Sequence, residues 1–336
     1  MTDIPATPPP LQMRPVELQD LARRFGLRLQ GPNRTIQSFN YVDAPAEAAP
    51  GLLTYVTAKP YAERATARGI AGAVTIADFA TDGETGWLIT DRDPAGAFYT
   101  MFAELGAEGQ WERLEARVGH GATIAPSAVI HENVEIGEEC RIMDHAVLMP
   151  NTRLGRNVVI KAGAVIGGDG FEVRMIGGRR RVVPHVGGVW LEDDVEVGSQ
   201  TCIDRGLFGE FTTIGAGTKI DNLVHIAHRV LIGPDCSVIA CAEVSGSVKL
   251  GSGVWVGPNA SINQQIELGD HAFIGTGSVV TRAVPAHGLA FGNPARLRGW
   301  VCRCRTSLEF SGTQAVCRAC GTRFTMENSQ VARTRE

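Results

Sequence analysis

The chain has 336 residues, enough for two modules, and a formal net charge of −4, which gives no indication of a nucleic-acid partner. Apolar residues make up 44% and charged residues 20%, a composition typical of a globular protein and not of a disordered one. The first fifteen residues are proline-rich and lack an apolar segment, so we expect no secretory signal. No apolar run reaches the roughly 18 residues of a membrane span. We therefore expect a cytoplasmic protein without a transmembrane segment.

Residues 1–117 are predicted to form a small α/β domain. Residues 15–25 have the pattern of a short amphipathic helix, with Pro15 near its start and Gly26 after its end. Apolar stretches at 52–56 and 73–76 predict strands, and residues 95–105 predict a second helix.

An aliphatic residue recurs at every sixth position over residues 118–280. The repeat falls into three runs: Val118 to Ile166, Leu191 to Ile203, and Ile214 to Val280. A helix would repeat every 3.6 residues and an exposed strand every two, so neither explains this period. A period of six is typical of hexapeptide β-helices, in which three short strands and three turns form one triangular coil. Residues 118–290 are therefore predicted to form a left-handed parallel β-helix of about eight coils, each aliphatic residue pointing inward.

The period is interrupted at residues 167–188 and again at about 208–213. The first interruption contains Asp169, Phe171 and a basic run at 179–181. Because long loops that leave a solenoid commonly carry its binding surface, we expect this loop to contribute to a functional site.

The densest polar cluster lies in residues 220–233. It contains four polar residues within two hexads: Asp221, Asn222, His225 and His228. A histidine has a pKa near neutrality, which suits removal of a proton from an amine that attacks a thioester. Asp221 or Asp169 is expected to orient the imidazole. The backbone N–H of Gly246 is the candidate donor to the oxyanion of the tetrahedral intermediate.

The eight cysteines fall into two groups. Four are scattered through the repeat and are expected to be small buried apolar residues in a reducing compartment. The other four form two knuckles near the C-terminus: Cys302, Cys304, Cys317 and Cys320. Four thiolates match the tetrahedral coordination of structural Zn²⁺, so residues 291–336 are predicted to form a zinc-ribbon-like tail. The metal would stabilise a segment too short for its own core, and we expect no catalytic cofactor.

Two alternatives from another functional class remain open. In the first, the chain is a non-catalytic hexapeptide scaffold, and the histidines lie on a solvated turn. In the second, it is a zinc hydratase like the hexapeptide-repeat carbonic anhydrases, in which three histidines hold zinc. His225, His228 and His271 would then be the ligands.

Three motifs carry a family resemblance: KAGAVIGGDGF (161–171), IDRG (203–206) and IDNLVHIAHRVLIG (220–233). They resemble the UDP-3-O-acylglucosamine N-acyltransferases of the lipid A pathway. The resemblance implies a homotrimer that moves a 3-hydroxyacyl group from acyl carrier protein to the amine of a UDP-3-O-acyl-glucosamine, with His228 as the catalytic base. Segments 49–65 and 71–76 are similar to the family's uridine-binding domain, which implies that Tyr55 and Tyr61 hold the uracil ring. We also expect four residues to contact the substrate: Phe171, Asn222, His225 and Gln265.

The sequence departs from that family in three places. Gln265 stands where the family has a second histidine, and the uracil-binding segment reads Ala58–Lys59–Pro60 where the family has Asn before Pro-Lys. The family's C-terminal helix is absent, and residues 288–304 instead resemble the tail of sugar-nucleotide acetyltransferases, which take acetyl groups from coenzyme A. A second hypothesis is therefore acylation or acetylation of another amino sugar nucleotide with coenzyme A as donor.

Overall fold

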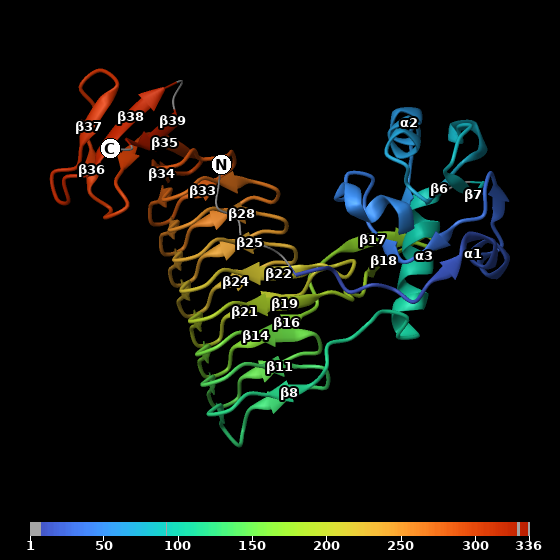
Figure 1. The fold of residues 1–336 in the computed structure, drawn as a ribbon, viewed down its shortest axis with the longest axis horizontal. Helices are drawn as coiled ribbons and strands as arrows, with labels where there is room; N and C mark the ends of the chain where they lie inside the picture. Colours follow the sequence, from blue (N-terminus) through green and yellow to red (C-terminus); the bar gives the residue numbers. More distant parts are fainter. Residues whose placement is uncertain (1–7, 92, 328–329, 335–336) are drawn as a thin grey trace.

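The structure is a computed structural model that describes residues 8–91, 93–327 and 330–334. The first seven residues, part of the segment used to predict that no secretory signal is present, lie outside this range. Figure 1 shows an N-terminal α/β unit beside a tall stack of coils, with a small β-module at the C-terminal end of the stack. None of the helices in the described residues has both the length and the apolar character needed to cross a membrane.

The N-terminal unit is a five-stranded sheet with three α-helices. The strand order is β2-β7-β6-β5-β4, and β2 at one edge is antiparallel to its neighbour while the others are parallel. The strands are β2 (Arg28–Gln30), β4 (Ser38–Phe39), β5 (Leu52–Tyr55), β6 (Gly72–Thr75) and β7 (Gly86–Ile89). The helices are α1 (Leu18–Phe25), α2 (Lys59–Ala67) and α3 (Pro94–Ala107), with 3-10 turns at Ala46–Gly51 and Ala77–Phe79.

Local signals explain where α1 and α3 begin and end. Helix α1 ends at Gly26, whose φ of 67° is left-handed and whose N–H donates to the Ala22 carbonyl. It begins later than predicted, because β1 (Val16–Glu17) pairs with β3 (Thr35–Ile36) and holds that segment extended. Helix α3 begins where the Asp93 side chain accepts a hydrogen bond from the Gly96 N–H, as an N-cap residue does.

The hexads form eight coils, as predicted. The first face holds β8 (Arg117–Val118), β11 (Glu135–Ile136), β14 (Thr152–Leu154), β19 (Gly188–Leu191), β22 (Phe211–Ile214), β25 (Leu231–Ile232), β28 (Lys249–Leu250) and β31 (Glu267–Leu268). The second holds β9 (Thr123–Ile124), β12 (Arg141–Ile142), β15 (Val159–Ile160), β20 (Glu196–Val197), β23 (Lys219–Ile220), β26 (Ser237–Val238), β29 (Trp255–Val256) and β32 (Phe273–Ile274). The third holds β10 (Val129–Ile130), β13 (Val147–Leu148), β16 (Val165–Gly168), β21 (Cys202–Asp204), β24 (His225–Ile226), β27 (Glu243–Val244), β30 (Ser261–Ile262) and β33 (Val279–Val280). These three faces make the prism.

The hexad aliphatics fill the prism, and one continuous apolar cluster extends from Val134 to Ala290. Val118 and Ile124 are exceptions, because they belong to the first coil and remain exposed at its open end. Of the four cysteines scattered through the repeat, only two are buried as predicted. Cys140 and Cys236 are buried, whereas Cys202 and Cys241 are exposed, since neither occupies an inward hexad position.

The first interruption forms a hairpin that leaves the prism. Strands β17 (Val173–Ile176) and β18 (Arg179–Val182) pair in antiparallel register around Gly177 and Gly178. Both glycines have left-handed φ values, 59° and 76°, as a tight two-residue hairpin turn requires. Ile176 and Val183 are buried in one apolar cluster with Phe98 and Phe102 of α3, so the hairpin packs the N-terminal unit against the prism.

The C-terminal module continues the second face of the prism. Strand β34 (Gly288–Gly292) pairs with β32, and β35 (Ala295–Val301) and β36 (Ser307–Leu308) extend that sheet. Three further strands form an antiparallel sheet: β37 (Gln314–Val316), β38 (Arg323–Glu327) and β39 (Gln330–Arg333). The fold is thus the predicted one: a left-handed parallel β-helix with a small α/β unit before it and a cysteine-bearing β-module after it.

Candidate active site

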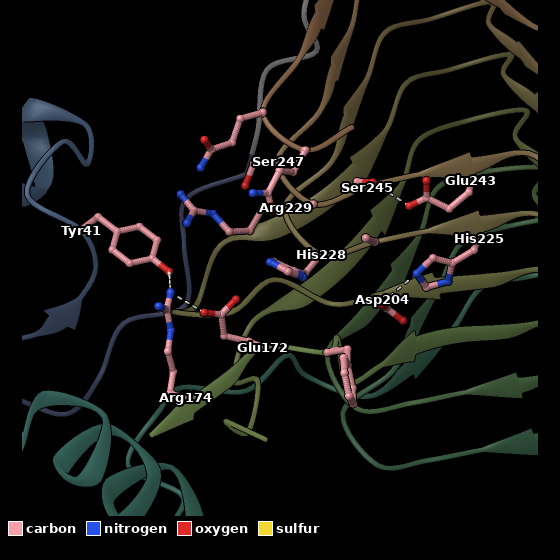
Figure 2. A pocket seen from close by; sticks show the side chains of 15 residues that line it. Tyr41, Glu172, Arg174, Asp204, His225, His228, Arg229, Glu243, Ser245 and Ser247 are labelled. Carbon is pink, nitrogen blue, oxygen red and sulfur yellow. Dashed lines mark hydrogen bonds and ion pairs between the residues drawn. The ribbon is translucent and has the colours of Figure 1, made fainter. Parts of the chain in front are cut away.

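A cavity of about 500 Å³ lies on the side of the prism that faces the N-terminal unit (Figure 2). Its lining combines Tyr41 from the N-terminal unit, three residues of the first interruption and a group from successive coils. The full lining is Tyr41, Phe171, Glu172, Arg174, Asp204, His225, Ala227, His228, Arg229, Glu243, Ser245, Gly246, Ser247, Gln264 and Gln265. Five predicted site residues therefore meet in one cavity: Phe171, His225, His228, Gly246 and Gln265.

The imidazole of His228 is held between two glycines. A Cβ added to Gly246 would lie 3.0 Å from Cε1 and from Nε2 of His228, and a Cβ added to Gly170 would lie 2.8 Å from Nδ1. The ring therefore presents Nε2 to the Gly246 side, which lines the cavity, and Nδ1 to the opposite side. Burial lowers the pKa of His228 below its ordinary value, which favours the neutral ring that can accept a proton.

The stacking of coils sets Gly246 against His228. The Ser247 N–H donates to the His228 carbonyl at 3.0 Å, and the Gln265 N–H donates to the Gly246 carbonyl at 3.0 Å. These bonds place one residue of each of three successive coils at the same corner of the prism. Gln265 thereby lies in the cavity beside the catalytic candidates, and its contact with substrate stays a prediction.

His225 lies at one side of the cavity and pairs with an acid that the sequence analysis did not select. Its Nε2 is 3.5 Å from Oδ2 of Asp204 on the neighbouring strand β21, and Figure 2 shows the two side chains together. Phe171 is 82% exposed at the edge of the cavity, where an apolar group of a ligand could cover it.

Asp221 and Asn222 do not reach the cavity. The Asp221 carboxylate accepts from the backbone N–H of Asn222 at 2.8 Å and of Ala240 at 3.2 Å. The Asn222 side chain accepts from the Ser199 N–H at 2.7 Å. Both side chains stabilise a turn of the prism. The prediction that Asp221 orients His228 does not match the structure. Asp221 lies in the turn before β24 and His228 lies in the turn after it, so the two residues occupy different corners of the prism.

Asp169 is engaged by an arginine. Nε of Arg205 donates to Oδ1 of Asp169 at 2.7 Å, and Nη2 of the same guanidinium contacts the same oxygen. Asp169 thus lies near the site without lining the cavity. Burial raises the pKa of Asp204 to about 7, and the nearby charge of Asp169 adds to the shift.

Two arginines that line the cavity were not selected by the sequence analysis. Arg174 of the hairpin pairs with Glu172 at 2.5 Å and donates to the Tyr41 hydroxyl at 3.5 Å (Figure 2). Arg229 pairs with Glu210 at 3.0 Å. The only sequence signal for Arg174 and Glu172 was their position in the first interruption, since both lie outside the three motifs that carry the family resemblance.

The two tyrosines expected to hold uracil have different surroundings. Tyr55 is half-buried, with its ring 5.1 Å from that of Phe98 and 5.8 Å from that of Tyr99. Tyr61 is 45% exposed on α2, and the Arg64 guanidinium lies 5.7 Å from its ring. Stacking of a base by this pair stays a prediction.

The four C-terminal cysteines converge as predicted. Their sulfurs all lie within 4.8 Å of one another. The Cys302–Cys320 and Cys304–Cys317 Sγ pairs are each 3.5 Å apart, near the roughly 3.8 Å that tetrahedral zinc with Zn–S bonds of about 2.3 Å requires. The donor set therefore fits a metal ion with four thiolate ligands.

The three histidines of the zinc-hydratase alternative do not converge. His271 lies beside His287, with ring centroids 5.1 Å apart, and does not line the cavity of His225 and His228. Within the described residues, the cysteine cluster is the only group with the geometry of a metal site.

A prism of stacked hexads with a histidine in a lateral cavity defines a hexapeptide-repeat protein. Consistent with this class, the family model described as bacterial transferase hexapeptide (six repeats) matches residues 133–168 and 247–282.

Curated relatives carry one shared name. A UDP-3-O-acylglucosamine N-acyltransferase of Anaeromyxobacter dehalogenans is 42% identical over 147 residues, 42% of this chain and 41% of that protein. One of Caulobacter sp. is 44% identical over 151 residues, 44% of each chain. The chain therefore spans less than half the length of the curated relatives it matches. The resemblance seen in the sequence is confirmed over that portion. Among solved structures, the UDP-N-acetylglucosamine acyltransferase of Francisella novicida is 27% identical, covering 55% of this chain and 68% of that one with a TM-score of 0.47.

Proposed function

We propose that this protein is an N-acyltransferase that moves a 3-hydroxyacyl group from acyl carrier protein to the amine of a UDP-3-O-acyl-glucosamine-type sugar nucleotide. The observation that carries the proposal is the placement of His228. Burial lowers the pKa of its imidazole, its Nε2 faces a cavity, and a glycine backbone lies directly beside it. The name shared by the curated relatives supports the same substrate class.

In the proposed reaction the sugar amine attacks the thioester carbonyl, and His228 Nε2 accepts the proton that the amine loses. A C–N bond forms, and the carbonyl oxygen becomes an oxyanion that the Gly246 N–H stabilises. When the intermediate collapses, the C–S bond breaks, and the His228 imidazolium gives its proton to the departing thiolate. The products are an amide and a free thiol.

Side chains around the cavity suit an anionic acceptor with an apolar arm. Arg174 and Arg229 line it and can approach a diphosphate, although each also has an acidic partner. Exposed Phe171 offers apolar surface for an acyl chain. Tyr55 and Tyr61 of the N-terminal unit are proposed to hold the uracil.

A second candidate uses coenzyme A as donor and another amino sugar nucleotide as acceptor. Two observations favour it. Gln265, in place of the second histidine of the N-acyltransferases, lies in the cavity, and the chain after residue 290 forms a β-module in place of their C-terminal helix.

The proposal includes an assembly, a metal and a compartment. We infer a homotrimer, a structural Zn²⁺ on Cys302, Cys304, Cys317 and Cys320, and a cytoplasmic location. The metal takes no part in the chemistry, because four protein thiolates fill the tetrahedron and leave no position for water or substrate.

A donor-by-acceptor matrix tests the function. Purified protein is incubated with acyl carrier protein thioesters or coenzyme A thioesters, each combined with UDP-3-O-acyl-glucosamine or another UDP-amino sugar. Product mass identifies the acyl group and its position. Amide formation from the carrier-protein donor supports the first candidate, and turnover with coenzyme A thioesters alone supports the second. The absence of turnover in every combination would contradict both.

A further inference from the structure

A second histidine, His185, lies against His228. It belongs to the first interruption, between β18 and β19, and only 3% of it is exposed. The ring centroids of His185 and His228 are 5.3 Å apart, and the rings meet nearly perpendicular, at 70°. The proposed chemistry assigns no role to His185.

The hydrogen bonding of His185 defines which of its nitrogens carries the proton. Nδ1 lies 3.1 Å from the Val183 carbonyl oxygen, which can only accept, so Nδ1 is the donor. Nε2 is then an acceptor in the neutral ring. Among the residues that the structure describes, this Nε2 is buried and has no hydrogen-bond partner, and the same is true of Nδ1 of His228.

Gly170 shows that the two unpartnered nitrogens face the same space. A Cβ at Gly170 would lie 2.7 Å from Nε2 of His185 and 2.8 Å from Nδ1 of His228. The opposite edge of the His228 ring faces Gly246 and the cavity. Each imidazole therefore directs one nitrogen toward the space that a side chain on Gly170 would occupy, which we call the gap above Gly170.

We propose that His185 is a positioning residue: in solution the two rings close the gap above Gly170, and Nε2 of His185 then accepts the Nδ1–H of His228, which keeps Nε2 of His228 unprotonated toward the cavity. A neutral histidine thereby takes the place of the carboxylate expected from the sequence. The consequence for catalysis rests on the proposed acyl transfer, whereas the pairing rests on the geometry of the free protein.

The surroundings keep this acceptor neutral. Burial, followed by the nearby His228, lowers the pKa of His185 to about 4, so it carries no proton on Nε2 at neutral pH. The charged and titratable groups that act on the pair are Asp169, Glu172, Arg205, Glu210, His225 and Arg229.

Two substitutions separate hydrogen bonding from packing. His185→Gln retains an acceptor oxygen, whereas His185→Phe retains a planar ring without an acceptor. We expect His185→Phe to lower kcat at least about tenfold with KM for the sugar nucleotide unchanged, and His185→Gln to restore most of that loss. Circular dichroism and thermal unfolding verify that each variant is folded. Equal kcat for His185→Phe and wild type would overturn the positioning role.

A spectroscopic measurement needs no substrate. Nitrogen-15 NMR of the histidine side chains should show His228 as the Nδ1–H tautomer in the wild type. In His185→Phe it should revert toward the Nε2–H tautomer that free imidazoles favour. A wild-type His228 that is already Nε2–H would overturn the pairing whatever the activity. If no acyl transfer is found but the tautomer shifts as expected, the pairing stands and the proposed function fails.

Gly170→Ala gives a third test within the same loop. Its methyl group would enter the gap between the two nitrogens, so we expect the same loss of kcat and the same tautomer shift as in His185→Phe. Gly168→Ala is the matched control, because its Cβ would meet the nearest atom at 3.8 Å, an ordinary contact. Wild-type kcat and tautomer in Gly170→Ala would contradict the proposal.

Discussion

The carboxylate of Asp204 lies 3.5 Å from Nε2 of His225, yet burial raises the pKa of this acid to about 7. In the unfolded chain an aspartate titrates near a pKa of about 3.9. Between these values the folded protein holds a proton that the unfolded chain has lost, so this group makes stability decrease as pH rises from about 4 to 7.

Asp204→Asn should remove that dependence. We expect the variant to match the wild type near pH 4 and to become more stable than it by pH 8, by up to about 4 kcal/mol, because each pKa unit corresponds to about 1.4 kcal/mol. Urea unfolding at a series of pH values measures the difference. Cys202→Ser on the same strand is the control, with no change of slope expected. A constant stability difference across this range would show that Asp204 titrates normally.

His228→Ala should abolish most turnover while leaving the fold intact. Loss of a general base typically lowers kcat by a factor of about 10²–10⁴. His225→Ala is the matched control from the same coil and should cost much less, since His225 pairs with Asp204 at the side of the cavity. Steady-state kinetics with the substrate pair identified above measures both. A His228→Ala enzyme that keeps more than about a tenth of kcat would contradict the assignment.

Tyr61→Ala should weaken binding of the sugar nucleotide more than it slows the chemistry. Stacking of a base on an aromatic ring is worth roughly 1–3 kcal/mol, so KM should rise while kcat changes little. Tyr61→Phe keeps the ring and serves as the control. Calorimetric titration with UDP gives an independent measurement, and equal affinity of wild type and Tyr61→Ala would exclude this residue from the uracil site.

The protein in solution should have about three times the 35.9 kDa mass of the chain. A closed three-fold ring repeats one interface three times, and the resemblance to homotrimeric acyltransferases is the reason to expect it here. Light scattering coupled to size-exclusion chromatography measures the mass. A fully active monomer would refute the trimer.

The four clustered cysteines should bind one zinc ion per chain. Cys317→Ser should lose the metal, because a closed structural site needs all four thiolates. Cys241→Ser, which alters an exposed cysteine of the prism, is the control and should retain it. Elemental analysis measures the metal content, and thermal unfolding of the chelated protein should show the C-terminal module melting first. Wild-type protein that is folded and active without zinc would contradict this site.

The sequence predicted the prism well because its rule is local and periodic. Each hexad places one aliphatic residue inward, so the eight coils follow from counting alone. Gly246 was found for the same reason, since it follows His228 by 18 residues, whereas Gln265 was found through the family resemblance. Asp221 was placed wrongly, because distance along the chain does not reveal the corner between two faces.

His185 was missed for a different reason. It lies in the aperiodic loop, whose hairpin packs against α3, and the contact of its ring with that of His228 belongs to this tertiary packing. Cys202 shows the same limit of sequence-based prediction, because it was expected to be buried and is exposed. A residue outside the inward hexad position has surroundings decided by what lies beside the prism, and the period contains no information about that.

The loop that contains the hairpin β17–β18 leaves the stack of coils and returns to it without changing the register of the coils on either side. Neighbouring coils contact each other across 18 residues of chain, as between Thr218 and Cys236, but across the hairpin the separation is 37, as between Asn157 and Asp194. Doubling a loop costs only about 0.6 kcal/mol of closure entropy. The ladder on either side keeps its register, since Thr152 still pairs with Val189. A loop that contributes Glu172, Arg174 and His185 can therefore be lengthened or exchanged at little cost to the stack, which makes it the natural position for grafting a different acceptor preference onto the same prism.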